Sequence, residues 1–213
     1  LFPYTTLFRS NSKVATVDSN GVVTGKSHGT VTITATGRDS MVANSVKVTV
    51  QTAPKSISLN ITEKTIDLST DAKSFQLIGT ISPSTANVYL EQTWTSSNTS
   101  IARVDEFGTI TGISNGEATV TAKTVNGLTK ICKVKVVTSP TAISLNKTNA
   151  VIDTTTSKNM QLTAVITPAS ANIYTGITWT SSNDNVVQVN QQGLVKGISN
   201  GLAIVTAKTE NGC

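Results

Sequence analysis

The chain has 213 residues, of which 14% are charged and 4% aromatic, and its formal net charge at pH 7 is +5. The positive charges are scattered and no basic run alternates with aromatic residues, so we expect no nucleic-acid partner. No stretch approaches the roughly 18 apolar residues that a membrane-spanning helix needs, so we expect no direct membrane insertion of these residues.

The first residues differ in character from the rest of the chain. Residues 1–10 read LFPYTTLFRS, a string that resembles the translation of a widely used sequencing adapter. We therefore interpret residues 1–9 as an artefact and set them aside from the fold prediction, as is done for a tag or a fusion scar. On this interpretation the absence of a signal peptide at the start carries no information about export.

One pattern then recurs along the chain. The run WTSSN starts at Trp94 and again at Trp179, 85 residues later, and the residues that follow each copy also match. An upstream copy, shifted by 87 residues, carries only the later half of the pattern. Such self-similarity indicates an array of one module. We predict a partial module over residues 10–52 (the first repeat), a complete module over 54–137 (the second repeat), and a module over 140–213 that lacks its last strand (the third repeat).

Within the complete module, short segments of alternating apolar and polar residues predict strands. They cover residues 56–60, 65–68, 74–81, 92–96, 101–104, 109–111, 118–123 and 129–137. Pro83 ends the third segment because proline cannot donate to a strand ladder. Trp94 and Trp179 are large enough to fill a core between two sheets. Strands this short and this numerous predict an antiparallel β-sandwich.

Recurring glycines predict the turns between these strands. Gly108 is expected in a tight hairpin turn, and Asn115 precedes a glycine at another turn where positive φ is tolerated. The only histidine, His28, stands where the other copies have Asn115 and Asn200. We therefore interpret His28 as a residue that accepts a left-handed turn, and not as a catalytic or metal-binding group.

The last predicted strand of the second repeat carries three lysines and a cysteine. Lys130, Lys133 and Lys135 are interpreted as charges that keep an exposed sheet edge from pairing. Cys132 alternates with inward-facing valines, which predicts a small buried hydrophobic residue and not a reactive thiol. Cys213 falls at a non-equivalent position, so the two cysteines define no repeated disulfide, and their redox state and role stay open.

The module resembles the group 2 bacterial immunoglobulin-like domain, which occurs in tandem in intimin-like and invasin-like adhesins. The matching runs are ISL at 57–59, WTSSN at 94–98, IARVD at 101–105, GTITG at 108–112 and GEATVTA at 116–122. The resemblance implies an all-β chain of tandem antiparallel Ig-like β-sandwiches. The connections at 51–54 and 138–140 are short and end in proline, which predicts semi-rigid linkers.

Residues able to carry chemistry are sparse. Asp67 recurs as Asp153. Asp105 matches Asp18 of the first repeat but is replaced by Asn190 in the third, and no carboxylate pair forms an evident acid/base dyad. No Asp-rich calcium loop is present. We expect no enzyme, no catalytic residue, no cofactor and no metal. Two alternatives stay open: calcium at a module junction, and an internal Lys–Asn crosslink, although no carboxylate is evidently placed to catalyse one.

The leading functional hypothesis is a structural and adhesive one. It makes the chain a stalk of a bacterial surface or secreted protein, with its export signal and anchor outside this segment, that presents a binding domain or its own loops to a host, matrix or cell-wall ligand. The alternative is a spacer or carbohydrate-binding accessory of an extracellular enzyme that acts on polysaccharide. Tyr89 and Tyr174, at equivalent positions, are the repeated candidates for carbohydrate contact, and the alternative for both is packing at a sheet edge. The organism, the number of repeats and the ligand are left open.

Overall fold

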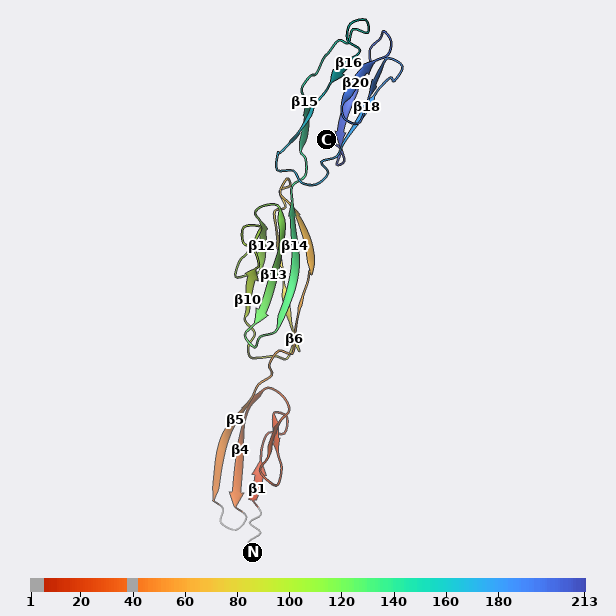
Figure 1. The fold of residues 1–213 in the computed structure, drawn as a ribbon. Coiled ribbons are helices and arrows are strands. Elements are labelled where there is room, and N and C mark those ends of the chain that lie inside the picture. Colours follow the sequence, from red (N-terminus) through yellow and green to blue (C-terminus); the bar gives the residue numbers. More distant parts are fainter. Residues whose placement is uncertain (1–5, 38–41) are drawn as a thin grey trace. The chain divides into compact units, whose positions relative to one another are not determined.

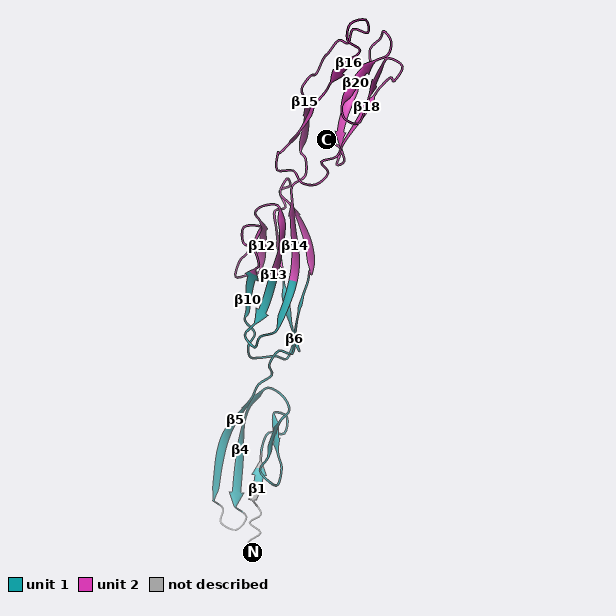
Figure 2. Cartoon of the chain, viewed as in Figure 1, with its two compact units in different colours: residues 1–60, 78–95, 121–131 teal, residues 61–77, 96–120, 132–213 magenta. Residues whose placement is uncertain are grey.

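The computed structural model describes residues 6–37 and 42–213, and every regular element in this part of the chain is a β-strand (Figure 1). Contacts between residues divide the chain into two compact units (Figure 2). Unit 1 comprises residues 1–60, 78–95 and 121–131, and unit 2 comprises 61–77, 96–120 and 132–213. The boundary between the units therefore runs through the second repeat and not through a linker.

The first repeat lies wholly in unit 1. Its strands are β1 (Thr6–Arg9), β2 (Ala15–Val17), β3 (Val23–Gly25), β4 (Gly29–Gly37) and β5 (Ala43–Val50). β1, β4 and β5 form one antiparallel sheet, and β2 and β3 form a hairpin. Ala15, Val31 and Ile33 are its buried core, with Phe8 packed against them. Strand β1 falls inside residues 1–9 and pairs with β4, with Leu7 opposite Thr36.

The second repeat contains three sheets. Its strands are β6 (Ser56–Leu59), β7 (Glu63–Asp67), β8 (Ser74–Gln76), β9 (Gly79–Ser82), β10 (Gln92–Ser96), β11 (Ala102–Val104), β12 (Thr109–Gly112), β13 (Gly116–Thr124) and β14 (Thr129–Val137). The strand orders are β10-β13-β14-β7, β11-β12-β8 and β6-β9. Apart from the segment 74–81, the predicted strands are thus present, with small shifts at their ends.

The segment predicted as one strand over residues 74–81 is two strands in different sheets. β8 pairs with β12, whereas β9 pairs with β6. The chain changes sheets at Leu77, which is fully buried and donates its N–H to the Gly108 carbonyl oxygen. The next N–H, of Ile78, donates to Asn60 Oδ1 at 2.7 Å. The alternation of apolar and polar side chains continues across Leu77, and for this reason the sequence pattern predicted a single strand over residues 74–81.

The interpretation of the lysine-bearing strand as a sheet edge was wrong. β14 lies between β13 and β7, so the edge is β7. β7 pairs with β14 in parallel, with Lys133 opposite Glu63 and Val136 opposite Ile66. β7, which comes early in the second repeat, thus pairs with β14, its last strand. This long-range pairing cannot be read from the pattern of apolar and polar residues.

The third repeat has a similar arrangement within unit 2, but residues 148–152, the equivalents of β7, form no strand. Its strands are β15 (Ala142–Leu145), β16 (Asn159–Gln161), β17 (Ala164–Thr167), β18 (Ile177–Ser181), β19 (Val187–Val189), β20 (Leu194–Gly197) and β21 (Val205–Thr209). β18 pairs with β21, β15 with β17, and β20 lies between β16 and β19. Leu162, Trp179, Val195 and Ala207 form the buried core. Trp179 is therefore a core residue as predicted, while Trp94 is partly buried.

The turn glycines behave as predicted, but the residues before them do not. Gly108 has φ 84°, and Gly116 has φ 146°. Among the described residues only Tyr89 and Tyr174 combine a side chain with positive φ, so Asn115, Asn200 and His28 do not adopt it. The expectation for those three was wrong because the following glycine alone takes the unusual backbone conformation.

Candidate functional sites at the repeat junctions

The recurring acidic position 105 builds a hairpin. Asp105 Oδ1 accepts hydrogen bonds from the backbone N–H groups of Phe107 at 3.0 Å and Thr109 at 2.7 Å. The bond from Thr109 is the largest influence that lowers the pKa of Asp105 below its ordinary value. Asn190 accepts the two equivalent bonds in the third repeat. Because the turn needs only an acceptor oxygen, an amide serves as well as a carboxylate.

Within the described residues, no group of three or more His, Cys, Asp or Glu side chains is placed to hold a metal ion. The same part of the chain has no helix of the length and apolar character that a membrane crossing requires.

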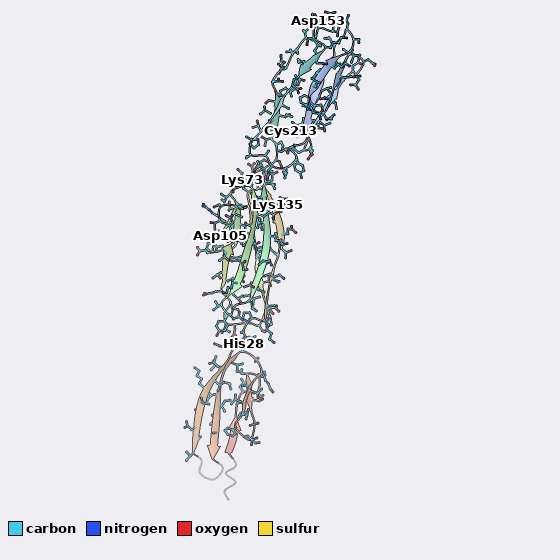
Figure 3. All side chains as sticks on the ribbon, in the orientation of Figure 1. His28, Lys73, Asp105, Lys135, Asp153 and Cys213 are labelled. Carbon is cyan, nitrogen blue, oxygen red and sulfur yellow. The ribbon has the colours of Figure 1, made fainter. Side chains whose placement is uncertain are left out.

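The two cysteines are free and lie in different surroundings. Cys132 is fully buried in β14, and this burial, with a smaller effect of the Glu63 charge, raises the pKa of its thiol. A thiol kept protonated is a poor nucleophile, which fits its prediction as a small hydrophobic residue. Cys213 lies beside the linker of the third repeat, with its Sγ 3.4 Å from the Pro140 carbonyl oxygen (Figure 3).

The candidate tyrosines share an uncommon geometry. Tyr89 and Tyr174 are 49% and 50% exposed, and their φ angles are 58° and 54°. A left-handed backbone costs roughly 1–2 kcal/mol at a residue with a side chain. Its recurrence at equivalent positions shows that the surrounding loop imposes it twice. Both residues are thus held half exposed.

The linker into the third repeat is held by two asparagines of that repeat. Asn172 exchanges two hydrogen bonds with Thr138: its N–H donates to the Thr138 carbonyl oxygen at 2.9 Å, and its Oδ1 accepts from the Thr138 N–H at 2.8 Å. Asn211 Nδ2 donates to the Pro140 carbonyl oxygen at 2.8 Å. These bonds satisfy the backbone polar groups of a segment that would otherwise need water.

The second repeat holds its own incoming linker in the same way. Asn87 exchanges backbone and side-chain bonds with Thr52 at 2.9 and 2.8 Å, and Asn126 Nδ2 donates to the Pro54 carbonyl oxygen at 2.9 Å. In the second and third repeats, asparagines of the repeat therefore hold the incoming linker by hydrogen bonds.

The linker at 138–140 is also held from the second repeat, upstream of it. Ser139 donates from its N–H to Asp67 Oδ1 at 3.1 Å and from its hydroxyl to Asp67 Oδ2. Thr138 Oγ1 donates to Asn115 Oδ1 at 2.7 Å, and Asn115 Nδ2 donates to the Ser170 carbonyl oxygen at 2.7 Å. Thr138 and Ser139 are only 4% and 7% exposed. This linker is thus a buried segment with hydrogen bonds to both neighbours.

The protonation state of Asp67 is set by the same contacts. Partial burial tends to raise its pKa, but the bonds donated by the Ser139 hydroxyl and by Ser69 together outweigh that effect, so the pKa lies below its ordinary value. Asp67 is therefore a carboxylate at neutral pH, the form that accepts every one of these bonds.

The linker at 51–54 has no such upstream partners. Ala53 replaces the serine and has no hydroxyl, and His28 lies at this end of the first repeat, in the place of Asn115 (Figure 3). Among the described residues of the first repeat, none forms a hydrogen bond to residues 51–54. Thr52 and Ala53 are also more exposed than Thr138 and Ser139. The two linkers differ in chemistry although both end in proline.

Sequence reasoning missed the asparagine and aspartate contacts to the linkers. Asn126 and Asn211 each precede a glycine, as a turn residue would, but their side chains reach back 72 and 71 residues to a proline carbonyl oxygen. The signal that could have found these contacts was recurrence. A polar residue that recurs in each copy, although the turn itself does not require it, is a candidate for a hydrogen bond to a distant part of the repeat.

Comparison with protein families gives one match that repeats along the chain. The model of the family described as bacterial Ig-like domain (group 2) matches residues 4–50, 55–134 and 139–212. The three segments together cover most of the chain and follow one another in tandem.

Three curated proteins share parts of the sequence. An uncharacterized protein of Clostridium acetobutylicum is 36% identical over 122 residues, 56% of this chain and 12% of that protein. Ice-binding protein 1 of Shewanella frigidimarina is 30% identical over 207 residues, 93% of this chain and 22% of that protein. An alpha-L-arabinofuranosidase of Bifidobacterium longum is 37% identical over 78 residues, 35% of this chain and 7% of that enzyme. The chain spans less than a quarter of each of these relatives.

Proposed function

The chain belongs to the bacterial Ig-like domain (group 2) family, and from this membership we propose that it is the structural, adhesive repeat region of a bacterial cell-surface or secreted protein. In this role the repeats, bounded at residues 10–52, 54–137 and 140–213, form a semi-rigid stalk. The stalk carries a binding domain, or loops of its own, away from the surface to which the protein is attached.

The linker at 138–140 is the observation that carries this proposal. A stalk transmits direction only if its joints resist bending, and a flexible polar linker would not do so. Here the linker is buried, and its residues bond to Asp67 and Asn115 on one side and to Asn172 and Asn211 on the other. A hydrogen bond contributes about 1 kcal/mol net, so several of them together oppose independent motion of the two flanking repeats.

Residual dipolar couplings test the stalk directly, because they report the orientation of each repeat in solution. In the full chain we expect the second and third repeats to share one alignment tensor, and the first repeat to show its own. The variant Asp67→Ala/Asn115→Ala should separate the tensors of the second and third repeats, since it removes the upstream contacts of the linker.

The matched control is Asp153→Ala/Asn200→Ala, which changes the equivalent residues of the third repeat. Asp153 lies at the end of that repeat opposite Cys213 and the linker (Figure 3). This control should leave the shared tensor unchanged. If the second and third repeats of the unmodified chain align independently, the stalk proposal is wrong.

A second role is favoured by the match to an arabinofuranosidase of Bifidobacterium longum. In that role the repeats space or dock a catalytic domain outside the cell. The residues that flank this segment in the whole protein distinguish the two roles: a hydrolase domain supports the spacer, and further repeats with a surface anchor support the adhesive stalk.

A further inference from the structure

The third repeat carries an open cleft of about 380 Å³ that lies within unit 2. Its lining includes the polar residues Gln161, Thr163, Thr175, Gln191 and Gln192, and the buried core residue Trp179 borders it. This volume falls within the range of small-molecule sites, about 300–1,000 Å³. We call this set of residues the third-repeat cleft. It contains no ionisable side chain, so its lining fits a neutral ligand better than an ionic one.

Two of the glutamines are fixed in position by backbone contacts. Gln191 holds both polar groups of Trp179: its Oε1 accepts from the Trp179 N–H and its Nε2 donates to the Trp179 carbonyl oxygen, each at 3.1 Å. Gln161 Nε2 donates to the carbonyl oxygens of Leu162 at 2.7 Å and Gln192 at 2.8 Å. Side chains that are already ordered lose little entropy when a ligand binds.

Other polar groups in the cleft have unused hydrogen-bonding capacity. In the second repeat Thr109 Oγ1 donates to Gln76 Oε1, but the equivalent of Thr109 in the third repeat is Leu194, which has no hydroxyl. Gln161 Oε1 therefore lacks that donor. Within the described residues, the Gln192 amide and the hydroxyls of Thr163 and Thr175 form no hydrogen bond with the protein. Amides and hydroxyls of this kind both donate and accept, as the hydroxyls of a sugar do.

An exposed tyrosine stands next to a lining residue in the chain, although it is not itself part of the lining. Tyr174, directly before Thr175 in the chain, is held half exposed by its left-handed backbone conformation. A sugar ring presents a face of C–H groups that packs on aromatic side chains and a rim of hydroxyls that need polar partners, so it requires both kinds of group together.

Three residues of the polar lining are specific to the third repeat, whereas Gln161 has the equivalent Gln76 in the second. At the equivalent positions 78, 90 and 107 of the second repeat the sequence has Ile78, Leu90 and Phe107. The fold therefore accepts apolar residues at these positions and does not require Thr163, Thr175 or Gln192. All six positions are exposed, so the polar groups of the third repeat are accessible to a ligand.

We propose that the third-repeat cleft binds a neutral carbohydrate, one or two sugar units at a time. Gln161, Gln192 and the two threonines contact the hydroxyls, and Tyr174 packs against the C–H face. The site goes beyond the stalk role and does not depend on a rigid linker. Binding of sugar by a chain whose linker is flexible would support the cleft proposal and contradict the stalk proposal. A rigid linker in a chain that binds no sugar would do the reverse.

The test is a titration of the full chain with neutral oligosaccharides of glucose, xylose, arabinose and galactose, followed by amide chemical shifts. For a shallow site with neutral hydrogen bonds we expect a Kd of about 1 mM for at least one of these sugars. The shifts should map to β16, β18 and the loops at 174–176 and 190–193. If none of the four sugar series produces shifts there at about 50 mM, the proposal is overturned.

Variants that exchange residues between repeats control for folding. Thr163→Ile/Thr175→Leu/Gln192→Phe installs the residues of the second repeat, which this fold already accommodates, and should weaken binding at least about tenfold. Tyr174→Gly, which suits the backbone conformation, should weaken binding without unfolding the repeat. The matched control Phe107→Gln in the second repeat should leave binding unchanged. Undiminished binding by the triple variant would contradict the assignment of the site.

Discussion

At the scale of single residues, the same residue type takes different roles at equivalent positions. Asp67 and its equivalent Asp153 each accept bonds from their own loop, from Ser69 and Thr155, but Asp67 also accepts bonds from Ser139 of the linker. Both carboxylates have a lowered pKa, Asp153 chiefly through the Thr155 hydroxyl. The difference in role therefore comes from what lies beside each carboxylate and not from the carboxylate itself.

Asp67→Asn should make the stability of the second repeat less dependent on pH. The folded-state pKa of Asp67 is lowered, so the carboxylate stabilises the fold above the unfolded pKa of about 3.9, and this contribution is lost as the pH falls through the folded pKa. Near neutral pH we expect the variant to be less stable by about 1 kcal/mol, because Asp67 is only partly buried.

The measurement is denaturant unfolding followed by Trp94 fluorescence in the Trp179→Phe background, at neutral pH and again at a pH below the folded pKa. The difference between the parent chain and the variant should shrink at the acidic pH. Asp153→Asn, in the third repeat, should not move the Trp94 transition. A difference that grows on acidification would contradict the role given to the Asp67 carboxylate.

Gly193→Ala should be more damaging than Gly127→Ala although both glycines have positive φ, 77° and 88°. A methyl group at Gly193 would lie 2.5 Å from the Leu162 carbonyl oxygen and 2.9 Å from the Trp179 ring, whereas nothing lies within 4 Å at Gly127. Backbone strain of about 1 kcal/mol is common to both, and the overlap adds roughly 1–3 kcal/mol at Gly193 alone. Denaturation monitored by amide signals of each repeat measures both losses. Equal losses would show that the overlap relaxes without cost.

At the scale of elements, one pair of facing positions on two strands is filled differently in the second and third repeats. In the second repeat Gln92 of β10 reaches across to Gly79 of β9, where its Nε2 donates to the Gly79 carbonyl oxygen at 3.1 Å. Its Oε1 is buried without a partner. In the third repeat the equivalent residues are Ile177 and Ala164, which line the third-repeat cleft together. The second repeat thus packs a polar side chain, Gln92, against a glycine, and the third repeat has an apolar side chain, Ile177, and an alanine at the same two positions.

This exchange predicts strong coupling between positions 79 and 92. Gly79→Ala alone should cost about 1 kcal/mol, because its methyl group overlaps the Gln92 amide and displaces it. In the double variant Gly79→Ala/Gln92→Ile that overlap is gone, and the buried oxygen without a partner is removed as well. We expect the double variant to be at least as stable as the parent chain, with a coupling energy of about 1 kcal/mol.

The four unfolding free energies of this cycle can be read from Trp94 fluorescence, since Trp94 lies on the same strand as Gln92 and Trp179→Phe removes the other tryptophan. Ala164→Gly in the third repeat serves as the reference for the intrinsic cost of glycine in this strand. Additivity of the two single changes within about 0.3 kcal/mol would mean that the pair does not act as a unit.

At the scale of the whole molecule, the repeats should differ in local stability. β13 lies between β10 and β14, and β14 contributes the buried Cys132, Val134 and Val136. β21, the equivalent of β13 in the third repeat, pairs with β18 alone among the described strands. Repeats with separate cores unfold locally, so the protection of each strand reflects its own neighbours.

We therefore expect amide hydrogens of β21 to exchange at least about tenfold faster than those of β13. Hydrogen exchange measured by mass spectrometry on peptides that cover 116–124 and 203–209 provides the comparison. Exchange at β18 and β10, both strands at a sheet edge, serves as the internal reference. Equal protection of β13 and β21 would show that the third repeat gains its stability from contacts other than strand pairing.

Much of the architecture could be predicted from the sequence because its signals are local. The recurrence of WTSSN predicted tandem modules, and alternation of apolar residues predicted most strands of the second repeat. The hairpin at Gly108 followed from the need of one backbone position for positive φ. These features depend on residues close together in the chain, whose geometry is set by side-chain periodicity and backbone sterics.

Tertiary structure alone decided the features that join distant residues. It placed β7 in parallel beside β14, broke the segment 74–81 between two sheets at Leu77, and brought Asp67 to Ser139, 72 residues away. It also gathered three glutamines and two threonines into the third-repeat cleft. The pattern of apolar and polar residues along the chain indicates which face of a strand is buried, but not which strand or loop covers that face. The covering element is decided when the sheets close, because distant backbone and side-chain groups must then satisfy each other's hydrogen bonds.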